Sequence, residues 1–154
     1  ARLGPYGDVR PMLGSVEDQE ALWNHLNSTI DCIASDHAPH TREEKEQPEG
    51  SPPGVPGLES TLPLMLTAAA QSRLTTTRLI ELLSTNPRQI FNLPEQADTF
   101  IEVDPLAKYT FSEHPFYTKC AWSPFSGMPM IGRLQRVVLR GREVVRDGIV
   151  LNYH

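Results

Sequence analysis

The chain has 154 residues and a net charge of −5, a length that fits one ordinary globular domain. Acidic and basic residues are interspersed, so no basic stripe predicts binding to nucleic acid or to a membrane surface. The two cysteines lack C-x-x-C spacing, and no signal peptide or membrane-spanning run is visible. We therefore expect a cytoplasmic protein with reduced thiols, whose partners are small molecules and other protein domains.

The first predicted helix begins near Ser15, which together with Asp18 forms a capping pattern, and it continues to about Asn27. The β-branched and apolar run 29–34 follows and predicts a buried strand that contains Cys32. Residues 37–57 carry five prolines and no periodicity. A connection of this length is functional or disordered in most compact domains.

Three further helices are predicted after this connection, over residues 58–71, 77–84 and 86–91. Pro63 is expected in the first turn of the first of them, where proline is tolerated. Asn86 is expected to cap the last one, with Ile90 and Phe91 packing inward. From about residue 96 short β-type runs replace the helices, and the sequence around 140–142 predicts a hairpin.

The string 35–41 (Ser-Asp-His-Ala-Pro-His-Thr) places one carboxylate and two imidazoles directly after the predicted strand. This composition is typical of a metal site or an acid/base site, and active sites of α/β barrels lie at such strand ends. Taken alone, Asp36 is equally compatible with a turn or helix-cap role. Pro39 stiffens the segment that carries Asp36 and His40, which favours a preorganised site.

The string 31–41 and the run 52–59 resemble those of dihydroorotases, and the resemblance extends through the segments 62–64, 86–91, 102–104 and 136–141. More narrowly, these segments resemble the dihydroorotase domain of the multifunctional pyrimidine-synthesis proteins of animals. The related hydantoinases and allantoinases usually carry Cys or Ser at the position of Ala38 and lack the histidine at position 40. The resemblance covers nearly the whole chain.

The resemblance implies an α/β fold in two parts. Residues 1–95 would form the C-terminal portion of a metal-dependent amidohydrolase (β/α)8 barrel, and residues 96–154 would form part of a small β-sandwich. A complete barrel of this kind requires about 250 residues. Because the sequence also lacks an initial methionine, we expect a C-terminal fragment that is inactive without the rest of the barrel.

The activity implied by the resemblance is the zinc-dependent, reversible cyclisation of N-carbamoyl-L-aspartate to dihydroorotate in pyrimidine biosynthesis. Asp36 matches the family's catalytic aspartate, which ligates one of two zinc ions and transfers a proton. The remaining ligands are expected outside this chain, which has no His-x-His pair. His40 and Arg10 match residues that contact the substrate, and Pro53 and Gly54 match the loop whose backbone meets it. A solvated arginine and an ordinary surface turn are the alternatives for Arg10 and for residues 53–54.

The partners implied by the resemblance are the substrate, the rest of the barrel, carbamoyl-phosphate synthetase and aspartate transcarbamoylase domains, and a second copy in a homo-oligomer. A non-catalytic dihydroorotase-like scaffold domain is the main alternative, and a hydrolase of another cyclic amide is a third. His37 is interpreted as structural rather than as a substrate contact, and residues 43–46 as an exposed helical turn without a role. Trp122 and Phe125 are interpreted as core residues or as residues that face the barrel.

Overall fold

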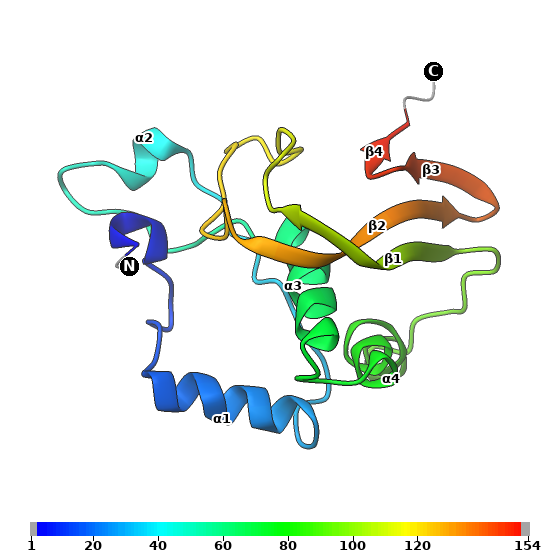
Figure 1. Cartoon of the computed structure of the whole chain (residues 1–154). Coiled ribbons are helices and arrows are strands. Elements are labelled where there is room, and N and C mark those ends of the chain that lie inside the picture. Colours follow the sequence, from blue (N-terminus) through cyan, green and yellow to red (C-terminus); the bar gives the residue numbers. More distant parts are fainter. Residues whose placement is uncertain (1–2, 152–154) are drawn as a thin grey trace.

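The computed structural model describes residues 3–151 and combines helices with a single antiparallel sheet (Figure 1). In chain order the elements are the 3-10 turn η1 (Gly4–Gly7), α1 (Val16–Leu26), α2 (Arg42–Lys45), α3 (Leu58–Ala70), α4 (Thr76–Ile80), the π-helical turn η2 (Glu81–Thr85), α5 (Asn86–Ile90), β1 (Phe100–Thr110), β2 (Pro129–Leu139), β3 (Arg142–Arg146) and β4 (Ile149–Val150). None of the described helices is long and apolar enough to span a bilayer. The fold is therefore mixed α/β, as expected.

Helix α1 begins and ends where the sequence predicts. The Ser15 hydroxyl accepts a hydrogen bond from the Asp18 N–H at 3.1 Å, and the Asp18 carboxylate accepts one from the Ser15 N–H at 2.8 Å. This reciprocal pair satisfies two backbone donors that a helix start leaves free. Asn27 ends the helix. The prediction is confirmed because a capping box involves only residues three positions apart.

The predicted strand 29–34 is not a strand in the structure. The segment contains no β-strand or β-bridge, and the Ile33 N–H donates to the Leu82 carbonyl at 3.1 Å instead of to a neighbouring strand. Within residues 3–151 the only sheet has the order β1-β2-β3-β4, which does not include this segment. The apolar pattern describes which side chains are sheltered, whereas a strand also requires a neighbour to pair with. Cys32 is accordingly half-buried rather than buried.

The two helices predicted after residue 76 form one continuous run, α4-η2-α5. The π-helical turn ends two residues before Pro87, whose missing N–H would interrupt an α-helical ladder. Asn86 is therefore not a cap, and its side chain donates to the Asp31 carbonyl at 2.7 Å. Ile90 and Phe91 do not pack inward, since they are 53% and 65% exposed. Pro63 lies in the second turn of α3 rather than in the first.

The hydrophobic core lies between α3, the run α4-η2 and the extended segment before Asp36. Its buried members are Met65, Ala68, Leu74, Leu79 and Leu82. Leu82 is 0% exposed, and the partly buried Ile33 packs against the same cluster. The core thus anchors the segment that leads to Asp36.

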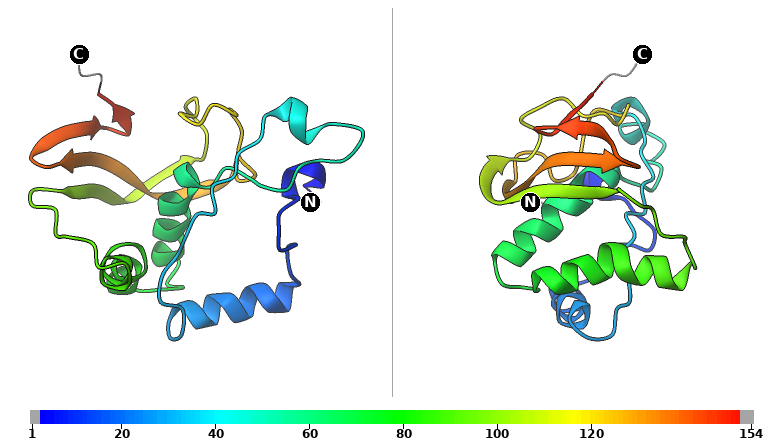
Figure 2. Two further views of the ribbon diagram at one scale, coloured as in Figure 1. Left: turned by 180° about the vertical axis from the view of Figure 1, so that it is seen from behind. Right: turned by 90° about the vertical axis from the view of Figure 1, so that its right-hand side faces the viewer.

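The sheet rests on helix α3, as Figure 2 shows from two sides. The backbone N–H of Ile131 in β2 donates to Oγ1 of Thr67 at 2.9 Å. Gly132 permits this approach, because a Cβ there would lie 2.7 Å from Cβ of Leu66. The predicted hairpin is confirmed, with β2 and β3 pairing antiparallel around Arg140-Gly141. The boundary between residues 95 and 96 remains a prediction.

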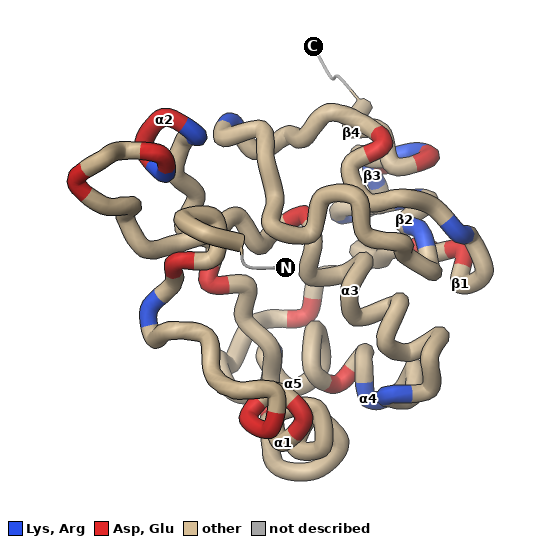
Figure 3. The backbone as a smooth tube through the Cα atoms, turned by 60° about the vertical axis from the view of Figure 1, so that its left-hand side comes forward, with Lys and Arg blue, Asp and Glu red and all other residues tan. Residues whose placement is uncertain are grey.

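Basic and acidic positions lie near one another along the sheet (Figure 3), and several of these residues form ion pairs. Arg136 lies 3.3 Å from Glu102 and 3.5 Å from Glu143. Glu143 also accepts hydrogen bonds from Arg146, and this contact is the main reason why the pKa of Glu143 is lowered. These pairs lie at the surface, where an ion pair contributes little to stability.

Candidate functional site

Asp36 lies in an unusual backbone conformation at the end of the extended segment. Its φ of 44° is in the left-handed region, which most L-residues avoid and which Asp and Asn tolerate better than most. Such residues are concentrated at active sites and ligand contacts, where the surrounding structure maintains the strain. The carboxylate belongs to an exposed residue and is therefore accessible. The local geometry is compatible with the predicted functional role of Asp36.

His37 has a structural role, as the sequence predicts. Its Nδ1 accepts hydrogen bonds from the backbone N–H groups of Gly57 and Leu58 at 3.1 and 3.2 Å. An accepting Nδ1 carries no proton, so the ring is bound here as the neutral tautomer protonated on Nε2. The contacts satisfy free donors at the start of α3. Glycine is needed at position 57, because a Cβ there would lie 2.4 Å from the Ser35 carbonyl oxygen.

Gly54 lies against the segment that carries Asp36 and His40. A short parallel bridge joins His37 to Val55, and the Ala38 N–H donates to the Val55 carbonyl at 3.1 Å. Gly54 itself has a φ of +132°, and a Cβ there would lie 2.5 Å from the Ala38 carbonyl oxygen. Backbone therefore meets backbone here without room for a side chain. Pro53 precedes this contact as an exposed residue.

Replacing Gly54 by Ala is expected to displace the loop and destabilise the protein by about 1–3 kcal/mol, because the new Cβ combines a forbidden φ with a backbone clash. Gly50→Ala is the matched control. Gly50 has a φ of +117° in the same loop, yet a Cβ at this position would have nothing within 4 Å. Denaturant midpoints of the two variants check the expectation. Equal midpoints would show that the close approach to Ala38 is unimportant.

Arg10 is joined to the same loop through Asp8. Its guanidinium contacts the Asp8 carboxylate and donates to the Val9 carbonyl at 3.0 Å. The Asp8 carbonyl in turn accepts a hydrogen bond from the Gly54 N–H at 2.9 Å. Arg10 is exposed, so its remaining N–H groups can reach a ligand. The structure thus connects Arg10, Gly54 and Ala38 into one network.

His40 is fixed through its backbone by a residue far along the chain. The Trp122 indole N–H donates to the His40 carbonyl at 2.7 Å, and Trp122 is only 2% exposed. The Tyr6 ring contacts Trp122 edge-on, with centroids 4.9 Å apart. His40 Nδ1 lies 3.4 Å from a Glu44 carboxylate oxygen, and the imidazole is 30% exposed. The core prediction for Trp122 is confirmed, whereas Phe125 is only half-buried.

Lys45 is the residue that sequence reasoning missed. The charged run 43–46 predicts an exposed turn without a role, but Lys45 is 0% exposed. Its ammonium group donates to the carbonyls of Asp8, Pro52 and Gly54. Burial lowers the pKa of Lys45, and the neighbouring Asp8 carboxylate opposes this effect. No sequence signal marks this lysine, since α2 is a single turn and its three flanking glutamates suggest solvent.

The described residues do not form a zinc site on their own. Among residues 3–151 no three His, Cys, Asp or Glu side chains are grouped so that they could hold a metal ion. A catalytic zinc site ordinarily has three protein ligands and an open position. Asp36 supplies one candidate ligand, so any zinc centre at this position requires ligands from elsewhere.

An apolar cleft of the described residues lies apart from the candidate site. It has a volume of about 350 Å3, lies between α3 and the segment 109–117, and is lined mainly by apolar side chains. None of the predicted site residues lines it. The candidate site is therefore defined by its connected polar groups rather than by a cavity.

Comparisons with known proteins give the chain its relatives. No protein-family model matches it. The chain is 50% identical to the multifunctional protein pyr1-3 of Dictyostelium discoideum and 50% identical to the multifunctional protein CAD of Squalus acanthias, in each case over 94% of this chain and 6% of the relative. It is 37% identical to a dihydroorotase of Thermococcus kodakarensis, over 94% of this chain and 36% of that protein. The chain is a dihydroorotase relative.

The structure of this dihydroorotase relative aligns with parts of solved amidohydrolase structures. L-hydantoinase from Arthrobacter aurescens is 30% identical with a TM-score of 0.87, over 98% of this chain and 37% of that one. The inactive dihydroorotase-like domain of a Chaetomium thermophilum CAD-like multifunctional protein is 31% identical with a TM-score of 0.73, over 92% of this chain and 40% of that one. The mixed α/β structure thus aligns with little more than a third of each amidohydrolase chain.

Proposed function

We propose that these residues act as part of a longer dihydroorotase, which cyclises N-carbamoyl-L-aspartate to dihydroorotate and hydrolyses dihydroorotate in reverse. The observation that carries the proposal is that the segment 36–40 is bonded to Val55 through His37 and Ala38, while Asp8 contacts both Gly54 and Arg10. The candidate residues therefore lie on connected segments. The 37% identity to a dihydroorotase supports the activity, and the 50% identity to CAD and pyr1-3 supports a longer, multifunctional protein. The same proposal has three further parts. The longer protein contains carbamoyl-phosphate synthetase and aspartate transcarbamoylase domains, it associates with a second copy of itself, and it is located in the cytoplasm.

Each candidate residue has a chemical task in this proposal. In the hydrolytic direction water adds to the ring amide carbon and gives a proton to the Asp36 carboxylate. The C–N bond then breaks, and Asp36 passes that proton to the departing nitrogen. The guanidinium of Arg10 and the imidazole of His40 are donors suited to the carboxylate and ureido oxygens of the substrate. The backbone at Pro53 and Gly54 contacts the bound ring. Asp36 also supplies one ligand to a zinc centre whose other ligands lie outside this chain.

A non-catalytic scaffold domain is the second candidate. The specific observation in its favour is the similarity to the inactive dihydroorotase-like domain from Chaetomium thermophilum. Presence of both Asp36 and His40 favours the enzyme, since a scaffold has no need for an accessible carboxylate in a strained backbone conformation. Zinc content distinguishes the two candidates, because a domain without ligands purifies without stoichiometric metal.

Substrate comparison is the experiment that tests the proposal. The complete protein is purified, its zinc content is measured, and it is offered dihydroorotate, hydantoin and allantoin under the same conditions. We expect stoichiometric zinc and the fastest turnover with dihydroorotate, because His40 and Ala38 distinguish this chain from the hydantoinase pattern. Faster turnover of hydantoin or allantoin would show that dihydroorotate is the wrong substrate assignment. A zinc-free protein without any turnover would support the non-catalytic scaffold domain.

A further inference from the structure

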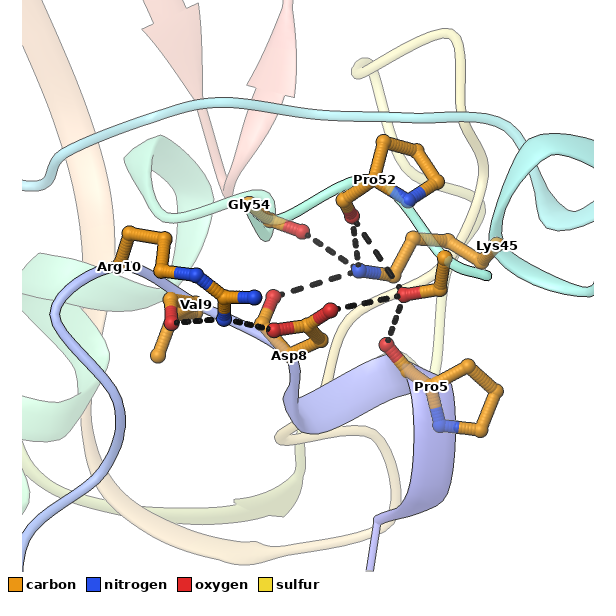
Figure 4. Close-up of polar contacts among 8 residues, drawn as sticks. Pro5, Asp8, Val9, Arg10, Lys45, Pro52 and Gly54 are labelled. Carbon is orange, nitrogen blue, oxygen red and sulfur yellow. Dashed lines mark hydrogen bonds and ion pairs between the residues drawn. The ribbon is translucent and has the colours of Figure 1, made fainter. Parts of the chain in front are cut away.

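The Lys45 side chain contacts the loop 52–54, and no step of the proposed reaction uses this side chain. Its ammonium group lies at the junction of three chain segments, where it donates to the Pro52 carbonyl at 2.7 Å, the Gly54 carbonyl at 3.2 Å and the Asp8 carbonyl at 3.3 Å (Figure 4). The side chain is 0% exposed although its helical turn α2 lies at the surface. A buried cation is costly unless its surroundings are arranged to receive it.

The charge of Lys45 matches its surroundings. An ammonium group has three N–H donors, and three carbonyl oxygens accept them, whereas a neutral amine could donate only two hydrogen bonds. The Asp8 carboxylate, whose charge acts on Lys45, is already engaged by Arg10 and by the Ser51 hydroxyl. Lys45 therefore acts on the backbone rather than in a conventional ion pair.

The three carbonyls belong to the segments that carry the candidate substrate contacts. Pro52 and Gly54 flank Pro53, so Lys45 fixes the chain on both sides of that residue. Asp8 lies two residues before Arg10, and its carbonyl accepts from both Lys45 and the Gly54 N–H. Gly54 is thus held at both of its backbone groups. A change at Lys45 would release both segments together.

We infer that Lys45 is a positioning residue, whose buried ammonium fixes the loop 52–54 and the segment 8–10 against the segment 36–40 so that the substrate contacts are preorganised. The inference rests on the proposed function for its substrate, but its structural part stands on the hydrogen bonds alone. Lys45→Met retains most of the side-chain volume and removes all donors. Lys45→Arg retains charge and donors in a different geometry.

The test compares Lys45→Met and Lys45→Arg with Lys119→Met in the complete protein. Lys119 is an exposed lysine, and its replacement removes the same charge outside the segments 8–10, 36–40 and 52–54. We expect Lys45→Met to raise KM for dihydroorotate at least about tenfold with kcat changed much less, because binding groups are misplaced while the reacting groups remain. Lys45→Arg is expected to restore part of the loss, and Lys119→Met to change nothing.

Hydrogen exchange of the loop supplies a readout that does not depend on turnover. The Gly54 N–H donates to Asp8 and the Ala38 N–H to Val55, so both amides should exchange faster in Lys45→Met while the amides of α3 keep their protection. Unchanged exchange and unchanged KM would overturn the inference and leave the proposed function intact. If wild-type protein turns over no substrate, the proposed function fails and the exchange alone decides the role of Lys45. If Lys45→Met does not fold, Lys45→Gln, which keeps two donors without the charge, is judged by the same two measurements.

Discussion

Replacing Asp36 by Asn in the complete protein is expected to lower turnover of dihydroorotate by about 10²- to 10⁴-fold, the usual contribution of a positioned proton-transfer group. An amide cannot accept and return the proton as a carboxylate does. The variant separates chemistry from folding, because Asn tolerates a φ of 44° at least as well as Asp. The measurement is kcat at saturating substrate, accompanied by a thermal melt to confirm that the fold is intact.

Asp31→Asn is the control for Asp36→Asn. Asp31 is an exposed carboxylate in the same segment, so the control makes the same chemical change at a position without a proposed catalytic role. We expect wild-type turnover from it. Turnover within threefold of wild type in Asp36→Asn would contradict the catalytic assignment, whereas equal losses in both variants would point to a general effect of charge.

Leu82→Ala is expected to destabilise the protein by about 2–5 kcal/mol, which is the usual range for removing a fully buried leucine. Leu82 is 0% exposed, lies at the centre of the core and accepts the Ile33 N–H at its carbonyl. The cavity would therefore open directly behind the segment that leads to Asp36. The shift in denaturant midpoint measures the loss of stability.

Leu106→Ala is the matched control for Leu82→Ala, since the same side chain is truncated at a residue that is 81% exposed. Its expected effect lies within about 0.5 kcal/mol. A small effect at both positions would show that the cluster around Leu82 is not a cooperative core. A loss of turnover in Leu82→Ala at temperatures where the protein remains folded would show that the core maintains the position of Asp36.

The features that the sequence predicts correctly depend on neighbours within a few residues. The Ser15 capping box spans three positions, and the hairpin around Arg140-Gly141 needs only two short runs and a turn. The strand predicted over residues 29–34 does not meet this condition. The composition of the segment indicates an extended, partly buried chain, but it does not indicate a neighbouring strand to pair with. Asn86 fails similarly, since its side chain bonds to Asp31, 55 residues earlier, instead of capping its own helix.

Part of the candidate site could be predicted and part could not. Asp36 and His40 stand out because a carboxylate and an imidazole flank a proline in one short string. The residues that hold these segments, Lys45 and Trp122, are not apparent in the sequence. Both donate hydrogen bonds to backbone carbonyls, which every residue has and which no sequence pattern identifies. The residues that perform chemistry are thus visible in the sequence, whereas those that hold the backbone in place become visible only in three dimensions.

The bond between Trp122 and His40 also sets an order of events during synthesis. The two residues are 82 positions apart, so a ribosome that adds about 5–20 residues per second makes the tryptophan about 4–16 seconds after the histidine. Helix α1 and the Ser15 capping box can form well before then. The His40 carbonyl must wait for its indole partner, so the substrate-binding segment of the nascent chain matures late, after most of this sequence has been made.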